Sequence, residues 1–302
     1  MTQEQLLKRL EKPKGPVDVV LDTDTFNEID DQYALSYLLR SPERLRLQAV
    51  YAAPFWNEKS TGPEDGMEKS YREILNVLHL LGEDRYIPQV LKGSRQYLEG
   101  EDKPAEAPAA RDLVRRALGQ PEDSPLYVVA IGAITNVASA LLMEPAIREK
   151  IVVVWLGGHA YSWPDTKEFN MQQDVAAARV VFGCGVPLVQ LPCMGVVSAF
   201  AATGPELEHW LRGKNALCDY LADLTAREAE ACGMGPCWSR VIWDVTAVAW
   251  LTGDFMEDCL TPSPIPQYDH RYSFDPTRHF IRYVYHIRRD KLMEDLFRKL
   301  AK

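Results

Sequence analysis

Val17-Asp-Val-Val-Leu-Asp-Thr-Asp-Thr-Phe-Asn-Glu-Ile-Asp-Asp-Gln-Tyr-Ala-Leu35 is the stretch of sequence that decides the fold. Its apolar, β-branched opening predicts a buried strand at residues 17–22, and the apolar spacing after residue 30 predicts a helix to about residue 40. Four aspartates lie within the ten residues 22–31: Asp22, Asp24, Asp30 and Asp31. Converging carboxylates repel one another unless a cation lies between them, and a hard divalent ion such as calcium binds several oxygen ligands at once.

Other interpretations of this stretch stay open on the residues alone. Aspartate is a preferred N-cap residue and its charge suits the positive end of the helix dipole, so a solvated helix start also fits. An Asp-x-Asp after an apolar run is also typical of phosphatases of the haloacid dehalogenase type, but Phe26 stands where those enzymes have Thr or Val. The Asp-x-Asp of metal-dependent sugar transferases is too short to discriminate.

The composition is that of a globular enzyme. The chain has 302 residues, of which 46% are hydrophobic and 25% charged, and this predicts one α/β domain over residues 1–302. The 43 acidic and 34 basic residues give a net charge of -9 without any basic tract, which argues against a nucleic acid or an anionic membrane as a partner. The amino terminus lacks the apolar core of a signal peptide and no run is long enough to span a membrane, so we expect a cytoplasmic protein.

The cysteines and glycines exclude two other kinds of site. The six cysteines are scattered through the second half of the chain, which is typical of reduced thiols. Cys232 and Cys237 are the only close pair, and no histidine lies near them at zinc-finger spacing. No Gly-x-Gly-x-x-Gly and no P-loop occur, so the loops are not built to hold nucleotide phosphates.

Strands and helices alternate along most of the chain, which predicts βαβ units and a mostly parallel central sheet flanked by helices. After the opening unit, strands are predicted at residues 45–53, 126–131, 151–156 and 186–191, and helices at 67–81, 110–118, 132–142 and 174–182. The C-terminal third is predicted to be helical, with helices at 205–231 and 238–251 and then a strand and an amphipathic helix within 280–301. Residues 54–65 predict a loop long enough to be functional.

Four separated segments resemble the nucleoside hydrolase family, the calcium-dependent enzymes that split a ribonucleoside into ribose and free base. The opening stretch resembles the family's Asp-x-Asp-Pro-Gly-x-Asp-Asp signature, although the longer Thr25-Phe-Asn-Glu-Ile29 replaces its Pro-Gly loop. Ile131-Gly-Ala-Ile-Thr-Asn136 resembles the Thr-Gly-x-x-Thr-Asn segment, and Glu168-Phe-Asn170 resembles the Glu-Phe-Asn segment. Trp243-Asp-Val-Thr-Ala-Val248 resembles the segment with the distal aspartate. The four segments follow the family's order and span almost the entire chain.

The resemblance implies a role for each matching residue. Asp24 would bind calcium and act as the general base that activates the attacking water. The other calcium ligands would be Asp31, Asp244 and the carbonyl of Ile131. Asp30 would hold a ribose hydroxyl, Glu168 would bind the 5′-hydroxyl end, and Asn57 and Asn170 would reach ribose or water, with Asp22 behind them orienting the cluster. The resemblance also implies a homodimer or homotetramer.

Two departures from the family pattern bear on specificity. Trp243 stands where members that accept many bases often carry a histidine that protonates the leaving base. Purine-preferring members resemble this chain there, and an indole can stack on the base, so we expect purine nucleosides to be slightly favoured. His159 follows a Gly-Gly turn near the predicted site and is a candidate substrate-binding residue or a hydrogen-bonding residue of the loop.

Simpler interpretations and a rival function stay open beside the resemblance. Glu168 and Asn170 also fit ordinary turn residues, and Asp244 also fits a helix residue paired with Arg240. The absent histidine and the altered loop also fit a ribose- or nucleoside-binding homologue that has lost turnover. A metal phosphatase is disfavoured by Phe26.

Overall fold

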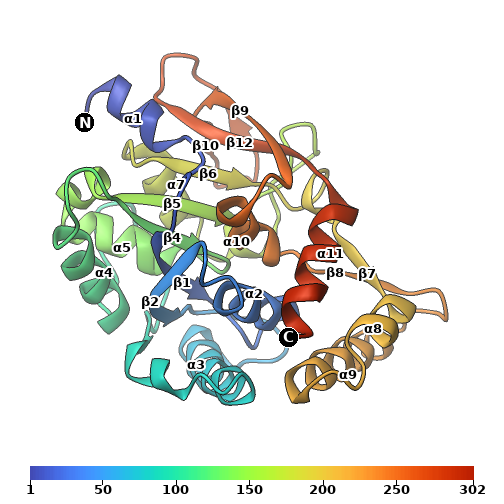
Figure 1. Cartoon of the computed structure of the whole chain (residues 1–302). Helices are drawn as coiled ribbons and strands as arrows, with labels where there is room; N and C mark the ends of the chain where they lie inside the picture. The colour runs from blue at the N-terminus through green and yellow to red at the C-terminus, as the bar shows by residue number, and fades with distance from the viewer.

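The computed structural model describes all residues 1–302, and its centre is one eight-stranded sheet (Figure 1). The strands lie in the order β3-β2-β1-β4-β5-β6-β12-β9. Neighbours are parallel from β3 to β12, and only β9 is antiparallel to its neighbour, so the predicted mostly parallel sheet is confirmed. The strands are β1 (Val17–Thr23), β2 (Leu45–Ala52), β3 (Val90–Lys92), β4 (Leu126–Ala130), β5 (Ile151–Leu156), β6 (Leu188–Leu191), β9 (Met256–Pro262) and β12 (Phe280–Ile287).

Helices cover both faces of the sheet, as expected from its central strands β4 and β5, in which every residue is apolar and buried. Side chains alternate between the faces, so Val19 and Leu21 of β1 belong to one hydrophobic core and Val20 to the other. The larger core packs against α2 (Asp30–Leu39), α3 (Pro63–Leu80), α9 (Ala216–Ala231), α10 (Val245–Thr252) and α11 (Arg289–Leu300). The smaller core packs against α4 (Pro108–Leu118), α5 (Thr135–Met143) and α7 (Val175–Gly183).

The parallel arrangement brings the carboxyl ends of several strands to one edge of the sheet. Asp22 pairs in register with Ala130 of β4, so the loops after β1 and β4 meet. Gly132 lets the loops approach closely at this meeting point, because a Cβ there would lie 3.1 Å from Asp24 Cγ and 3.1 Å from the Ala53 side chain. Small residues at this edge of the sheet leave room for the polar loops to converge.

The last third differs in part from its prediction. Its helices are present, but the predicted helix 205–231 is two helices, α8 (Gly204–Trp210) and α9, separated by a turn at Gly213, whose φ is 71°. The predicted helix 238–251 is instead the short strand β8 (Ser239–Val241) followed by α10, and β8 pairs with β7 (Ala201–Thr203). The edge strand β9 and the two-residue strands β10 (Ile265–Pro266) and β11 (Tyr272–Ser273) were not predicted, because they carry no clean apolar alternation.

The remaining segments add short elements at the periphery. A helix, α1 (Gln3–Arg9), opens the chain, and α6 (Phe169–Gln173) is a short helix before α7. Short 3-10 helices occupy Asp84–Gln89, Pro145–Glu149 and Val197–Ala199. All six cysteines are free thiols, and none of the helices is long and apolar enough to cross a membrane.

Candidate active site

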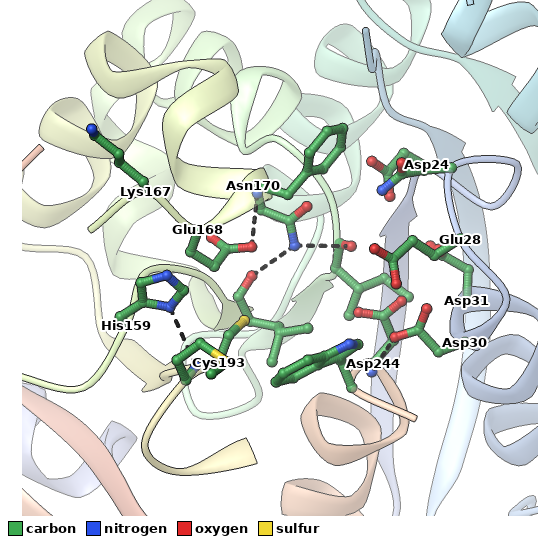
Figure 2. Close-up of a pocket in the computed structure, with 16 residues that line it drawn as sticks. Asp24, Glu28, Asp30, Asp31, His159, Lys167, Glu168, Asn170, Cys193 and Asp244 are labelled. Atoms are coloured by element: carbon green, nitrogen blue, oxygen red, sulfur yellow. Dashed lines mark hydrogen bonds between the residues drawn. The ribbon is translucent and has the colours of Figure 1, made fainter. Parts of the chain in front are cut away.

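A pocket opens at the edge of the sheet where the strand carboxyl ends converge, and it contains every residue predicted to bind metal. Figure 2 shows the aspartates on one side of it and Glu168, His159 and Cys193 on the other. It is lined by 16 residues: Asp24, Asn27, Glu28, Asp30, Asp31, Ile131, Leu156, His159, Lys167, Glu168, Phe169, Asn170, Cys193, Met194, Trp243 and Asp244.

Three aspartates form a tight buried cluster at the start of two helices. Asp30 and Asp31 are the first residues of α2, and Asp244 is the N-cap residue of α10. One carboxylate oxygen from each lies within 4.8 Å of the others. Thr23 Oγ1 donates a hydrogen bond to Asp31, and the backbone N–H of Asp244 donates to Asp30 Oδ2 over 3.2 Å. The strand end and both helix starts therefore fix the three carboxylates against one another.

Asp24 brings a fourth carboxylate to the pocket without any partner of its own. Both of its carboxylate oxygens are buried and accept no hydrogen bond from the protein. A buried carboxylate left unpaired in this way costs several kcal/mol or takes up a proton. Together with the cluster, it offers the all-oxygen donor set that hard divalent cations prefer, so the residues fit a metal ion of this kind.

The raised pKa values of these aspartates indicate that the negative charges of the cluster need a compensating positive charge. Burial raises the pKa of Asp24, Asp30 and Asp244 well above the ordinary range, and the neighbouring carboxylates raise them further. Burial also raises the pKa of Asp31 to about 7, although the hydrogen bond from Thr23 opposes the rise. Without a cation, the cluster must therefore hold protons near neutral pH.

Asp22 lies behind the pocket and does not line it. Its Oδ1 accepts a hydrogen bond of 2.8 Å from Asn136 Nδ2, while its Oδ2 is buried without a partner. Burial raises the pKa of Asp22 to about 7. Asn136 belongs to the predicted Ile131–Asn136 segment, so this contact ties two of the segments singled out in the sequence.

The wall opposite the aspartates is organised by Glu168, the N-cap residue of α6. Its carboxylate accepts hydrogen bonds from the backbone N–H groups of Asn170 (2.8 Å), Met171 (2.9 Å) and Gly158 (2.8 Å). Burial nevertheless raises the pKa of Glu168 to about 7. Because Gly158 has a φ of 75° and a Cβ there would meet the Tyr272 hydroxyl oxygen at 2.1 Å, this turn requires glycine.

Asn170 connects this wall to the predicted metal ligand on β4. Its Nδ2 donates to the carbonyl oxygens of Ile131 (3.2 Å) and Leu156 (3.0 Å), the last residues before two strand-end turns. The Ile131 carbonyl has a second lone pair that this bond leaves free. Asn170 therefore fixes the direction of the carbonyl that the sequence singled out, as Figure 2 shows.

His159 lines the pocket beside Glu168 and is almost completely buried. Its Nδ1 accepts a hydrogen bond of 3.2 Å from the backbone N–H of Met194, so the ring proton of the neutral side chain lies on Nε2. Burial lowers the pKa of His159, which favours this neutral form. The ring is fixed as a hydrogen-bond donor toward its free side.

Two predicted contacts turn out differently. Asn57 does not line the pocket, and its Nδ2 instead donates to Asn27 Oδ1 over 2.7 Å. Arg240 does not pair with Asp244, because its guanidinium lies 3.4 Å from Glu28. Trp243 does line the pocket, immediately before Asp244.

Several lining residues were missed by the sequence analysis: Asn27, Glu28, Leu156, Lys167, Phe169, Cys193 and Met194. Asn27 and Glu28 lie between the two aspartate pairs of the opening stretch, so their place in the lengthened loop was an available signal. Cys193 and Met194 follow β6, and the rule that sites gather at strand carboxyl ends points to them. No local pattern marks Lys167.

Comparison with known proteins gives a consistent result. A family model described as inosine-uridine preferring nucleoside hydrolase matches residues 19–266. The pyrimidine-specific ribonucleoside hydrolase RihA of Enterobacter sp. (strain 638) is 33% identical over 195 residues. That match covers 57% of this chain and 58% of the relative, so it spans less than two thirds of the relative's length.

Solved structures share the whole fold at low sequence identity. A plant nucleoside hydrolase, the PpNRh1 enzyme, superposes with a TM-score of 0.75 at 20% identity, covering 95% of this chain and 99% of that one. A purine-preferring ribonucleoside hydrolase from Gardnerella vaginalis gives a TM-score of 0.74 at 21% identity, covering 94% and 98%. These likenesses concern the fold.

Proposed function

Since the chain belongs to the nucleoside hydrolase family, whose model matches residues 19–266, we propose that it hydrolyses the N-glycosidic bond of ribonucleosides to ribose and free base. The observation that carries the proposal is the unpaired Asp24 carboxylate, which lines the same pocket as the Asp30, Asp31 and Asp244 cluster. A fixed set of carboxylates suits a reaction in which positive charge develops on the sugar.

The metal ion of this proposal is Ca²⁺, held by Asp24, Asp31, Asp244 and the carbonyl of Ile131. These are oxygen donors, and calcium accepts them in a flexible shell with room for sugar hydroxyls. When bound, the ion would polarise a coordinated water and so assist the loss of its proton to Asp24. Asp30 belongs to the same cluster, and its proposed role is to hold a ribose hydroxyl by accepting a hydrogen bond from it.

The side chains then divide the work of the reaction. Asp24 accepts the proton of the attacking water, which its unpaired oxygens leave it free to do. The buried carboxylates stabilise the oxocarbenium-like sugar as the base departs. Across the pocket, Glu168 receives the 5′-hydroxyl end, and Asn170 holds the Ile131 carbonyl in place. His159 offers its Nε2–H to a substrate oxygen.

Trp243 supports a preference for purine bases. It lines the pocket beside Asp244, and an indole face offers the larger stacking area to the larger base. The printed names of the relatives divide between pyrimidine-specific and purine-preferring enzymes. The preference proposed here therefore rests on this chain's own Trp243.

The proposal is tested by incubating the purified protein with inosine, guanosine, adenosine, uridine and cytidine and measuring reducing sugar. We expect release from at least one purine nucleoside, loss of release with chelator, and loss of release in Asp24→Ala. Asp18→Ala is the matched control, because Asp18 lies on the same strand but pairs with Arg46 outside the pocket. Binding without release would favour a nucleoside-binding homologue, and release of phosphate from nucleotides would contradict both.

A further inference from the structure

The lengthened loop Thr25–Ile29 between β1 and α2 is held in one shape by contacts on several sides. Gln32 Nε2 donates to the carbonyl of Thr25 over 2.8 Å, and the backbone N–H of Asn27 donates to the carbonyl of Asp24 over 2.7 Å. Lys59 Nζ donates to the carbonyl of Asn27 over 2.9 Å. The backbone of the loop is therefore preorganised, which fixes the positions from which its side chains enter the pocket.

A chain of hydrogen bonds fixes which end of the Asn27 amide faces the pocket. The backbone N–H of Lys59 donates to Asn57 Oδ1 over 2.8 Å, and a backbone N–H can only donate, so this atom of Asn57 is the oxygen. Asn57 Nδ2 is consequently the end that lies 2.7 Å from Asn27, where it donates to Asn27 Oδ1. The Nδ2 group of Asn27 is left as the free end.

That free amide nitrogen belongs to a residue that lines the pocket and is 7% exposed. Six carboxylates line the pocket, Asp24, Glu28, Asp30, Asp31, Glu168 and Asp244, and the donors His159 and Lys167 lie on the side opposite the aspartates (Figure 2). The Nδ2 group of Asn170 already donates to two carbonyls. A hydroxyl or water that donates a hydrogen bond to Asp24 can also accept one through an oxygen lone pair. Asn27 lies in the same turn as Asp24 and can supply that hydrogen bond.

We propose that Asn27 donates a hydrogen bond to the substrate hydroxyl or water oxygen beside Asp24, and that Asn57 is the positioning residue that orients it. The inference rests on the proposed nucleoside hydrolysis and deepens it. The contact with ribose or water that the family resemblance assigned to Asn57 is thereby assigned to Asn27 of the lengthened loop. The group that Asn27 would bind is a hydroxyl or water oxygen that also donates a hydrogen bond to a carboxylate.

The test measures kcat/KM for inosine with Asn27→Ala, Asn27→Asp, Asn57→Ala and the Asn27→Ala/Asn57→Ala double variant. Asn27→Asp keeps the oxygen that faces Asn57 and replaces only the donor, so it tests the donor without removing the side chain. We expect both Asn27 variants to lose about ten- to a hundredfold, as for removal of one fixed donor. Asn76→Ala is the matched control, because Asn76 is an exposed asparagine on α3 outside the pocket.

The positioning role has its own signature. Asn57→Ala alone is expected to lower kcat/KM, but to cause no further loss in the Asn27→Ala background, because the two residues act as one unit. The urea midpoint and the calorimetric Ca²⁺ affinity are expected to stay unchanged. Additive losses, wild-type kcat/KM in Asn27→Ala, or a uniform fall in Ca²⁺ affinity would each overturn the inference.

Failure of the proposed function is distinguishable from failure of this inference. If the wild-type protein releases no ribose from any nucleoside, the proposed function fails. The same four variants are then compared by calorimetric binding of inosine. Equal weakening in Asn27→Ala and the double variant supports the Asn27 contact, and unchanged binding overturns it.

Discussion

Trp243 lines the pocket next to Asp244, and it is the residue on which we propose that base preference depends. Stacking of a base on an aromatic side chain contributes about 1–3 kcal/mol. We therefore predict that Trp243→Ala lowers kcat/KM for inosine and guanosine by about tenfold or more, with a smaller loss for uridine. Trp243→Phe should retain most of the activity. Steady-state kinetics on the three nucleosides check this, and equal losses for inosine and uridine would argue against stacking.

Asp22 is the residue that gives the clearest pH dependence of stability. Burial raises its pKa in the folded protein to about 7, whereas an unfolded aspartate loses its proton near pH 4. Between these values the folded state binds more protons than the unfolded state, so the free energy of unfolding falls as pH rises from about 4 to about 7. The contribution is fully present below about pH 4 and lost above about pH 7.

Asp22→Asn is predicted to flatten this dependence, because the amide cannot ionise and its oxygen can still accept from Asn136. Urea unfolding of the chelated protein at a series of pH values gives the measurement. Asp31 and Glu168 also have a pKa raised to about 7, so part of the slope remains in the variant. An identical slope in wild type and variant would show that Asp22 ionises normally.

At the scale of elements, Glu168 joins the stability of α6 to the shape of the pocket. Its carboxylate accepts three backbone N–H groups, and loss of an N-cap acceptor costs about 0.5–2 kcal/mol. We predict that Glu168→Ala lowers the free energy of unfolding within that range and that Glu168→Gln lowers it less. In activity assays, both variants should lose the discrimination between inosine and 5′-deoxyinosine. Retained discrimination would place the 5′ end elsewhere.

The elements that could be predicted are those with runs of apolar residues, because such runs indicate burial. The strands β4 and β5 are apolar throughout and β1 contains the apolar run Val19–Leu21, and the structure contains each of them at the expected residues. The edge strand β9 has only one fully buried residue, shows no alternation of burial, and includes Glu257 and Asp258, so no apolar period marks it. Its pairing with β12 is a long-range contact that local pattern does not encode.

The residues of the candidate site also fall into those that the sequence could place and those that it could not. Asp24 and Asp31 could be placed because the end of a strand and the start of the next helix converge at one edge of a parallel sheet, whereas Asp244 was assigned through the family resemblance. Residues inside loops could not be placed, because a loop's path depends on its contacts. Asn57 was expected in the pocket, but the Lys59 and Asn27 contacts direct its amide behind Asn27.

For the molecule as a whole, the carboxylate pocket is expected to make the free energy of unfolding depend on a divalent cation. An ion that binds only the folded state stabilises it by about 2.7 kcal/mol at a hundred times its Kd. We predict that Ca²⁺ raises the urea midpoint of the wild-type protein at pH 7 and that chelator reverses the change. Asp31→Ala or Asp244→Ala should abolish the response, whereas Asp18→Ala should keep it. The same rise in Asp31→Ala would place the ion elsewhere.

The central claim is that water, activated at Asp24, cleaves a ribonucleoside held in this pocket. Mass spectrometry of the sugar formed from inosine in ¹⁸O-labelled water, with Ca²⁺ present, tests it most directly. The account predicts ribose with one ¹⁸O atom at C1, hypoxanthine in equal amount, and neither product with Asp24→Ala. Unlabelled sugar, or no cleavage of inosine by the wild-type protein, would contradict it.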